Sequence, residues 1–294
     1  MNTVTFYKEN QLVLGVKTEK GIIDVKEATG AFPTIEAVPQ TVSELVSSGE
    51  EGKRALEALV EQAVKEQTAL LNENELTFGP SVDNPQKIIC VGLNYKRHAD
   101  EIKMEYPKTP ILFSKFANAL AGHNEEVVLP PNGKEYDYEA ELAIVIGKVA
   151  KDVKVEDALS YVYGYTNGND LSARDFQFRT HQWLLGKTVD GFCPIGPSLV
   201  SKEEIDDPNN LSIRLSLNGE LRQNSNTSDM IFNCAEIISY ISQHMTLLPG
   251  DIILTGTPEG VIMGEPEETR TWLKAGDEVT VEIEKLGSLT TKFI

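Results

Sequence analysis

The sequence predicts a β-dominated α+β fold with a small α+β domain at its N-terminus. After residue 86, short apolar runs alternate with turns rich in glycine and proline. These runs are expected to form strands at 88–91, 111–114, 142–146, 211–217, 252–254 and 279–283. One convincing helix, at 235–243, and a short one, at 155–158, interrupt them. Because helices do not alternate regularly with the strands, a doubly wound α/β sheet is not expected.

The first 80 residues have a different pattern. Apolar residues alternate from Leu12 to Val16 and return at 22–25, beyond a turn at 19–21, so a hairpin is predicted. Apolar residues then recur at helical spacing from Leu56 to Val64, which predicts an amphipathic helix. A cluster of breakers follows at 78–85. We therefore expect a small domain over residues 1–80 and a larger one over residues 81–294.

Composition is typical of a soluble enzyme. The chain has 294 residues, of which 40% are hydrophobic, enough for a sizeable core. Its apolar stretches are short and the first residues lack the features of a secretory signal, so no membrane span and a cytoplasmic location are expected. A formal net charge of -18 would repel nucleic acid and anionic membranes, which excludes both as expected partners.

The three cysteines, Cys90, Cys193 and Cys234, are widely spaced and contain no CxxC motif. This pattern indicates neither a disulfide framework nor a zinc site. We expect each of them to be a small buried apolar residue.

Two glutamates at strand spacing point to a metal. In a strand, Glu139 and Glu141 point to one side, while Tyr138, Ala140 and Leu142 point to the other. Two like charges beside an apolar run cost roughly several kcal/mol unless a cation lies between them. Asp170 could complete an all-oxygen site, which favours Mg²⁺, Mn²⁺ or Ca²⁺ over Zn²⁺. The alternative is the solvated face of an amphipathic strand, which an isolated E-x-E pattern would favour.

Several further motifs occur in order along the chain. They lie at 92–101, 137–147, 169–175, 186–187, 194–197, 218–223, 230–232, 249–251 and 255–261. Together they resemble the fumarylacetoacetate hydrolase family, in its short-chain form, over about the last two thirds of the chain. The resemblance implies a mixed sheet rolled into a barrel-like structure with the site at one mouth. It also implies a homodimer.

His98 and Glu101 lie three residues apart. On a helix they would be neighbours, so Glu101 could orient and polarise the imidazole for proton transfer. A solvated surface pair is the ordinary alternative. The resemblance implies a dyad that activates water, on a segment, 94–107, that can close over the substrate.

The resemblance also implies roles for four other residues. Lys187 would be a fixed cation beside the metal, although a surface lysine is the ordinary alternative. Arg174 and Gln177 would contact substrate oxygens, and they share a face with Asp170 if a helix begins near that residue. An i, i+4 salt bridge between Arg174 and Asp170 is the alternative. Thr257 would bind the substrate carboxylate.

The expected activity is cleavage of a C–C bond in a 2,4-dioxo carboxylate by a Mg²⁺- or Mn²⁺-dependent hydrolase, with Ca²⁺ as another possible ion. The substrate would be a small anionic keto acid of the acylpyruvate or fumarylacetoacetate type, and the products pyruvate or an acetoacetate-type acid, as in aromatic catabolism. Two alternatives use the same enolate chemistry: decarboxylation of oxaloacetate and isomerisation of 2-hydroxyhepta-2,4-diene-1,7-dioate. A remoter alternative is a non-catalytic binding protein that keeps the metal pocket.

Overall fold

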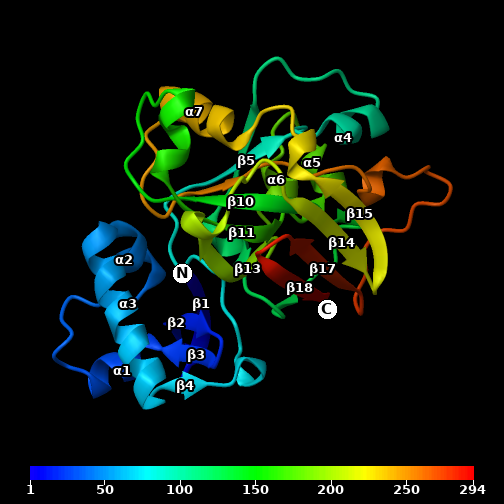
Figure 1. The fold of residues 1–294 in the computed structure, drawn as a ribbon. Coiled ribbons are helices and arrows are strands. Elements are labelled where there is room, and N and C mark those ends of the chain that lie inside the picture. Colours follow the sequence, from blue (N-terminus) through cyan, green and yellow to red (C-terminus); the bar gives the residue numbers. More distant parts are fainter.

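Strands dominate the computed structural model, which describes residues 1–294 (Figure 1). The strands are Asn2–Lys8 (β1), Gln11–Thr18 (β2), Gly21–Asp24 (β3), Leu70–Leu71 (β4), Ile88–Gly92 (β5), Ile111–Lys115 (β6), Leu120–Ala121 (β7), Glu126–Val127 (β8), Tyr136–Asp137 (β9), Ala140–Ile146 (β10), Val162–Asn169 (β11), Ser172–Ala173 (β12), Cys193–Ser201 (β13), Ser212–Leu217 (β14), Glu220–Asn226 (β15), Ile252–Leu254 (β16), Glu278–Ile283 (β17) and Gly287–Phe293 (β18). The helices are Val25–Ala31 (α1), Val42–Ser47 (α2), Gly49–Glu66 (α3), Lys96–Glu101 (α4), Arg174–Gln177 (α5), Leu184–Lys187 (α6) and Cys234–His244 (α7), with short 3₁₀ helices between them. The predicted β-dominated α+β fold is confirmed.

The strands form two large sheets. An 11-stranded sheet follows the path β4-β3-β2-β1-β13-β11-β10-β16-β5-β6, with β7 added beside β13. A 5-stranded sheet has the order β15-β14-β17-β18-β8. The larger sheet is mixed, because β16 and β5 run parallel while β10 and β11 run antiparallel. Its edge strands β4 and β6 do not pair with each other, so the barrel-like sheet implied by the resemblance is not a closed barrel.

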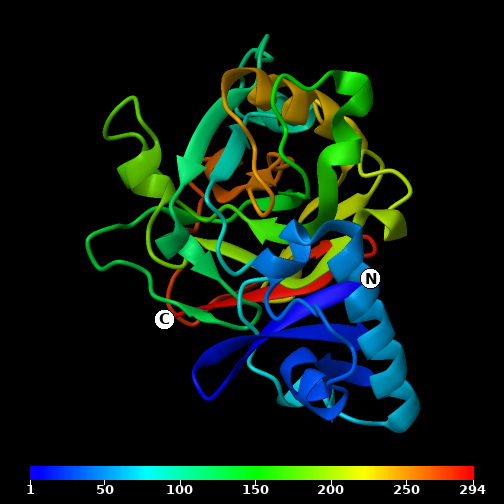
Figure 2. The same ribbon diagram turned by 90° about the vertical axis from the view of Figure 1, so that its left-hand side faces the viewer.

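The N-terminal elements gather at one end of the molecule (Figures 1 and 2). The predicted hairpin is confirmed as β2 and β3, which pair from Gly15 with Asp24 to Thr18 with Gly21. The sequence did not predict β1, which pairs with both β2 and β13. One continuous sheet therefore crosses residue 80, and a division into two domains there stays a prediction.

Two predicted helices are confirmed. In α3, the buried residues include Leu56, Leu59 and Ala63, one stripe of an amphipathic helix. Helix α7 begins with a capping box, in which the Asn233 side chain accepts from the Glu236 N–H and the Glu236 carboxylate accepts from the Asn233 N–H. The short helix predicted at 155–158 is a 3₁₀ helix, Val155–Tyr161, that packs against α7. None of the helices is both long and apolar enough to cross a membrane.

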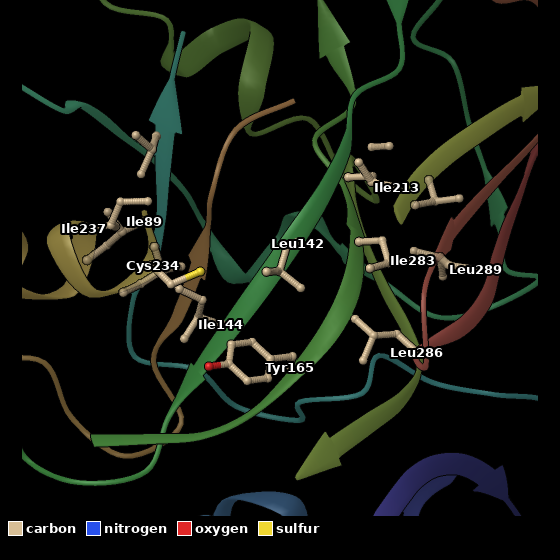
Figure 3. Packing of buried hydrophobic residues seen from close by; sticks show 14 of the residues in the cluster. Ile89, Leu142, Ile144, Tyr165, Ile213, Cys234, Ile237, Ile283, Leu286 and Leu289 are labelled. Carbon is tan, nitrogen blue, oxygen red and sulfur yellow. The ribbon is translucent and has the colours of Figure 1, made fainter. Parts of the chain in front are cut away.

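Strand β10 is buried on both faces. Leu142 and Ile144 belong to the larger core cluster, where they point toward side chains of α7 and of the 5-stranded sheet (Figure 3). Ala143 and Val145 belong to a second cluster, shared with the N-terminal helices. The strand begins at Ala140, so Glu139 lies just before it and Glu141 one residue inside it. The core on both sides holds this end of the strand in place.

Candidate functional site

Three carboxylates meet where β10 and β11 pair. The backbone N–H of Glu139 donates to the side chain of Asn169 at 3.0 Å, and the N–H of Asp170 donates to the carbonyl of Glu139 at 2.9 Å. These bonds place Asp170 beside Glu139 and Glu141, and one oxygen of each carboxylate lies within 4.8 Å of the others. All three side chains are buried. The predicted grouping is therefore present. The alternative, in which Glu139 and Glu141 lie on a solvated strand face, is excluded by their burial.

The charges in this cluster are unbalanced. Burial and the nearby charges of Asp170 and Glu139 raise the pKa of Glu141 well above its ordinary value. Burial would also raise the pKa of Glu139, but Lys187 and Arg174 outweigh it and lower that pKa to about 2. Glu141 receives one hydrogen bond from the backbone, from the N–H of Gly256 at 2.6 Å. Gly256 has φ +100°, and a Cβ there would lie 2.7 Å from that of Asn94, so only glycine fits this approach.

The cluster fits a hard divalent cation. Its donors are carboxylate oxygens only, they are buried, and Glu141 is unfavourably charged without an added cation. Mg²⁺, Mn²⁺ and Ca²⁺ prefer such oxygen donors. The residues that would hold the ion are Glu139, Glu141 and Asp170.

Two buried lysines lie against the cluster. Lys187, at the end of α6, has its Nζ 2.7 Å from Glu139 Oε2 and 2.8 Å from Asp170 Oδ2. Burial would lower the pKa of Lys187, but Asp170 and Glu139 raise it above the ordinary value. Lys187 is therefore a buried cation beside the carboxylates and not a surface lysine. Lys115, at the end of β6, has its Nζ 2.6 Å from Asp170 Oδ1.

Arg174 bonds to other partners than the sequence suggested. The helix expected from near Asp170 begins only at Arg174, because 172–173 form β12, which pairs with β9. Extended backbone between the two residues removes the i, i+4 relationship, and Arg174 makes no salt bridge to Asp170. Its Nη2 lies 2.8 Å from Asp137 Oδ2 and 2.7 Å from Glu139 Oε1, while Nη1 donates to Gln177 at 3.0 Å.

Asp137 supports this arrangement from behind. Besides Arg174, it accepts hydrogen bonds from the backbone N–H groups of Ile262 and Met263 at 2.8 and 3.0 Å. The N–H of Tyr138 also donates to Asp137, at 2.9 Å, so the oxygens of Asp137 are already used by a guanidinium and three amides.

His98 and Glu101 form a pair on α4. This stretch is helical, and it places His98 Nδ1 3.3 Å from Glu101 Oε2, while the N–H of Gly260 donates to Glu101 Oε1 at 3.0 Å. His98 is only 5% exposed, so this is not a solvated surface pair. Because a carboxylate faces Nδ1, that nitrogen is placed to carry the proton and Nε2 is left as the atom that can accept one.

One cavity of about 500 Å³ collects these groups. It is lined by most of the predicted site residues, namely His98, Glu101, Glu139, Glu141, Arg174, Gln177, Lys187 and Thr257. Asp170 lies behind the wall, fully buried. Thr257 accepts a hydrogen bond from Gln223 at 3.0 Å, which holds its hydroxyl at the cavity. The exposed His181 is not among the lining residues.

Sequence reasoning missed several lining residues, among them Trp183, Gly264 and Arg270. Trp183 lies four residues before Lys187, so a helical spacing from the predicted cation could have identified it. Gly264 ends a 3₁₀ helix, Ile262–Gly264, and Arg270 follows it in a loop. Both reach the cavity only through tertiary packing, and no local pattern singles them out.

Comparisons with known proteins match this chain in sequence and in fold. Residues 87–294 match the family model described as the C-terminal domain of fumarylacetoacetate hydrolase. A mitochondrial oxaloacetate tautomerase of Bos taurus is 47% identical over 277 residues, 93% of this chain and 84% of that protein. A solved fumarylacetoacetate hydrolase from Exiguobacterium antarcticum has a TM-score of 0.84 at 31% identity, covering 100% of this chain and 99% of that one. A fumarylpyruvate hydrolase from Pseudomonas aeruginosa, solved with Mn²⁺ and pyruvate, has a TM-score of 0.66 at 32% identity, covering 74% of this chain and 95% of that one.

Proposed function

This chain belongs to the fumarylacetoacetate hydrolase family, and we propose that it interconverts the enol and keto forms of oxaloacetate. The bovine oxaloacetate tautomerase, at 47% identity, is more similar in sequence than the solved hydrolases, at 31% and 32%. The comparisons therefore favour enolate chemistry on oxaloacetate over the C–C hydrolysis expected from the sequence. Tautomerisation needs the same stabilised enolate as decarboxylation of oxaloacetate, the alternative considered from the sequence, but no bond between carbon atoms breaks.

The observation that carries the proposal is a proton-transfer pair and two buried cations in one cavity. His98 and Glu101 lie 3.3 Å apart, and Lys187 and Arg174 line the same cavity. Proton transfer by a positioned histidine typically contributes roughly 10²- to 10⁴-fold in rate. A keto–enol reaction requires a group that moves a proton and cations that stabilise the negative oxygen, so these residues meet both needs.

In the proposed reaction, C3 of the enol form gains a proton and the hydroxyl oxygen on C2 loses one. His98 Nε2 would hold the transferred proton, and Glu101 would keep the imidazole oriented through Nδ1. Lys187 would stabilise the negative charge on the substrate oxygen, since it is buried and stays protonated. A divalent ion held by Glu139, Glu141 and Asp170 would supply Lewis acidity to the 2-oxo end of the substrate.

The decisive experiment follows the enol form of oxaloacetate by its ultraviolet absorbance, with added Mg²⁺ or Mn²⁺, and measures pyruvate in parallel. We expect the enzyme to speed ketonisation without releasing pyruvate, and His98→Gln to slow it roughly 10²-fold or more. Arg54→Gln is the control, because Arg54 is exposed on α3. Ketonisation at the uncatalysed rate with either ion would contradict the proposal.

Hydrolysis of acylpyruvates is a second candidate. The cavity, about 500 Å³, is large enough for an acid longer than oxaloacetate, and the fumarylpyruvate hydrolase shares the fold. In this reaction His98 would activate water for attack on the 4-carbonyl. Release of pyruvate from acetylpyruvate faster than ketonisation of oxaloacetate would favour it. A lack of turnover on either substrate and on hydroxymuconate-type dienoates would instead indicate a binding protein.

A further inference from the structure

Arg270 is a cation of the cavity wall that has no carboxylate partner. Its Nη2 donates to the backbone carbonyls of Met263 and Glu265, at 2.6 and 2.8 Å. The guanidinium lies over the ring of Trp272, 5.3 Å from its centre. These contacts fix the group in position without neutralising its charge. Its Nε is buried and has no hydrogen-bond acceptor in the chain.

The buried cations of the site differ from Arg270, which is half-buried, in this respect. Arg174 is paired with Asp137 and Glu139, and Lys187 with Glu139 and Asp170. Even the neighbouring carboxylate, Glu265, is already paired with Arg222. Lys103 also lines the cavity without a carboxylate partner, but it is exposed and surrounded by water, so its charge is screened.

A guanidinium that lacks a carboxylate partner, and whose Nη1 makes no hydrogen bond in the chain, is suited to bind an anion. A carboxylate there would accept charge-assisted hydrogen bonds in a position that the backbone contacts already prepare. Other residues that line the cavity, such as Phe113, Trp183 and Met263, offer no group that could compensate a second negative charge. The chain also carries a net charge of -18, so a dianion needs a local cation to enter.

We infer that Arg270 is the subsite for the second carboxylate of a dicarboxylic 2-oxo acid. The first carboxylate and the 2-oxo group lie at the end where Glu139 and Glu141 line the cavity, and Arg270 receives the other end. The cavity thus selects dicarboxylic over monocarboxylic acids. This inference rests on the proposed function and specifies its substrate class.

The test measures binding of acids that are not turned over. Calorimetry with Mg²⁺ present would compare two matched pairs: 2-oxoglutarate with 2-oxopentanoate, and 2-oxoadipate with 2-oxohexanoate. We expect the wild-type protein to bind the dicarboxylate of at least one pair roughly 10- to 100-fold more tightly. Equal affinities within both pairs would overturn the inference.

The variants locate the preference. Arg270→Gln should lose it while keeping the affinity for monocarboxylates within about twofold, and Arg54→Gln should keep it in full. Arg270→Lys retains the charge without the forked donor, so we expect part of the preference to remain. This second variant keeps the inference testable if Arg270→Gln does not fold. An Arg270→Gln protein that still prefers dicarboxylates, or one that weakens both members of a pair equally, would count against the subsite.

The binding measurements and the ketonisation assay together separate this inference from the proposed function. A dicarboxylate preference that depends on Arg270, without ketonisation of oxaloacetate, would refute only the reaction. Ketonisation without such a preference would refute only the subsite.

Discussion

Lys115 Nζ lies 2.6 Å from Asp170 Oδ1, and neither side chain is exposed to solvent. The same ammonium group donates to the backbone carbonyls of Leu171 and Phe192, at 2.9 and 2.7 Å, and to that of Lys187. One buried charge therefore connects a carboxylate of the candidate metal site with the segments on both sides of it. Removing such a charge leaves buried acceptors without their donor, and Asp170 with Lys187 as its remaining cation.

Lys115→Met is expected to lower the free energy of unfolding of the metal-free protein by about 3 to 5 kcal/mol, because Asp170 loses one of its two buried cations and three backbone carbonyls lose their donor. Urea denaturation measures it. Lys65→Met is the control, since Lys65 is exposed on α3 and a change there is expected to alter the free energy by no more than about 0.5 kcal/mol. Similar losses in both variants would show that Lys115 does not organise the site.

Glu141→Gln is expected to abolish metal binding without lowering the stability of the metal-free protein. The raised pKa of Glu141 means that its charged form is disfavoured in the fold, so a neutral amide of the same shape relieves repulsion. In the wild-type protein, Mg²⁺ or Mn²⁺ at about 100 times its Kd should add about 2.7 kcal/mol to the free energy of unfolding. Thermal melting with chelator and with metal measures both effects.

The control for this prediction is Glu57→Gln, which removes an exposed carboxylate on α3 and should keep the full response to metal. A Glu141→Gln protein that is stabilised by metal as strongly as the wild type would remove Glu141 from the ligand set.

Gly264→Ala is expected to slow catalysis by displacing Glu101. A Cβ at Gly264 would lie 2.4 Å from the carboxyl carbon of Glu101, so the carboxylate must move away from His98. We expect the rate constant of the proposed reaction to fall by roughly 10-fold or more, since proton transfer depends on an oriented imidazole. Metal affinity should be unchanged. Steady-state kinetics and calorimetry measure the two quantities.

Two further variants test this explanation. In Gly264→Ala combined with Glu101→Asp, the shorter side chain leaves room for the new methyl group, so part of the lost activity should return. Gly30→Ala is the matched control, because a Cβ there meets nothing within 4 Å. A fully active Gly264→Ala enzyme would mean that Glu101 does not need its present position.

Leu142→Ala is expected to destabilise the fold but to leave the metal affinity of the folded protein unchanged. Leu142 is fully buried and lies on the face of β10 opposite to Glu141, so truncation opens a cavity in the core shown in Figure 3. Such a change typically costs about 2 to 5 kcal/mol in the free energy of unfolding. Val149→Ala is the control, because Val149 is 59% exposed. Chemical denaturation checks the prediction, and a loss below about 1 kcal/mol would contradict it.

The homodimer implied by the family resemblance stays a prediction. Light scattering at micromolar concentration should give twice the mass of one chain. A monomer mass under these conditions would refute it.

Local patterns in the sequence determined the elements around the site. Alternation along β10 placed Leu142 and Ile144 on one face and Glu141 on the other, and the spacing of His98 and Glu101 placed them together on α4. Residues two to four apart are neighbours in a strand or helix whatever the rest of the chain does, so such relationships can be read from the sequence. The grouping of Glu139 and Glu141 with Asp170 was also expected. Two neighbouring glutamates beside an apolar run require a cation, and Asp170 could supply a third carboxylate to bind it.

Only the tertiary structure decided which distant residues surround that cluster. Because β12 pairs with β9, Arg174 forms salt bridges with Asp137 and Glu139 and not with Asp170. The burial of Lys115 and Lys187, and the approach of Gly264 and Arg270 to the cavity, likewise depend on long-range packing. Strand pairing and close packing bring together side chains that are far apart in the chain, and such contacts cannot be predicted from short sequence patterns.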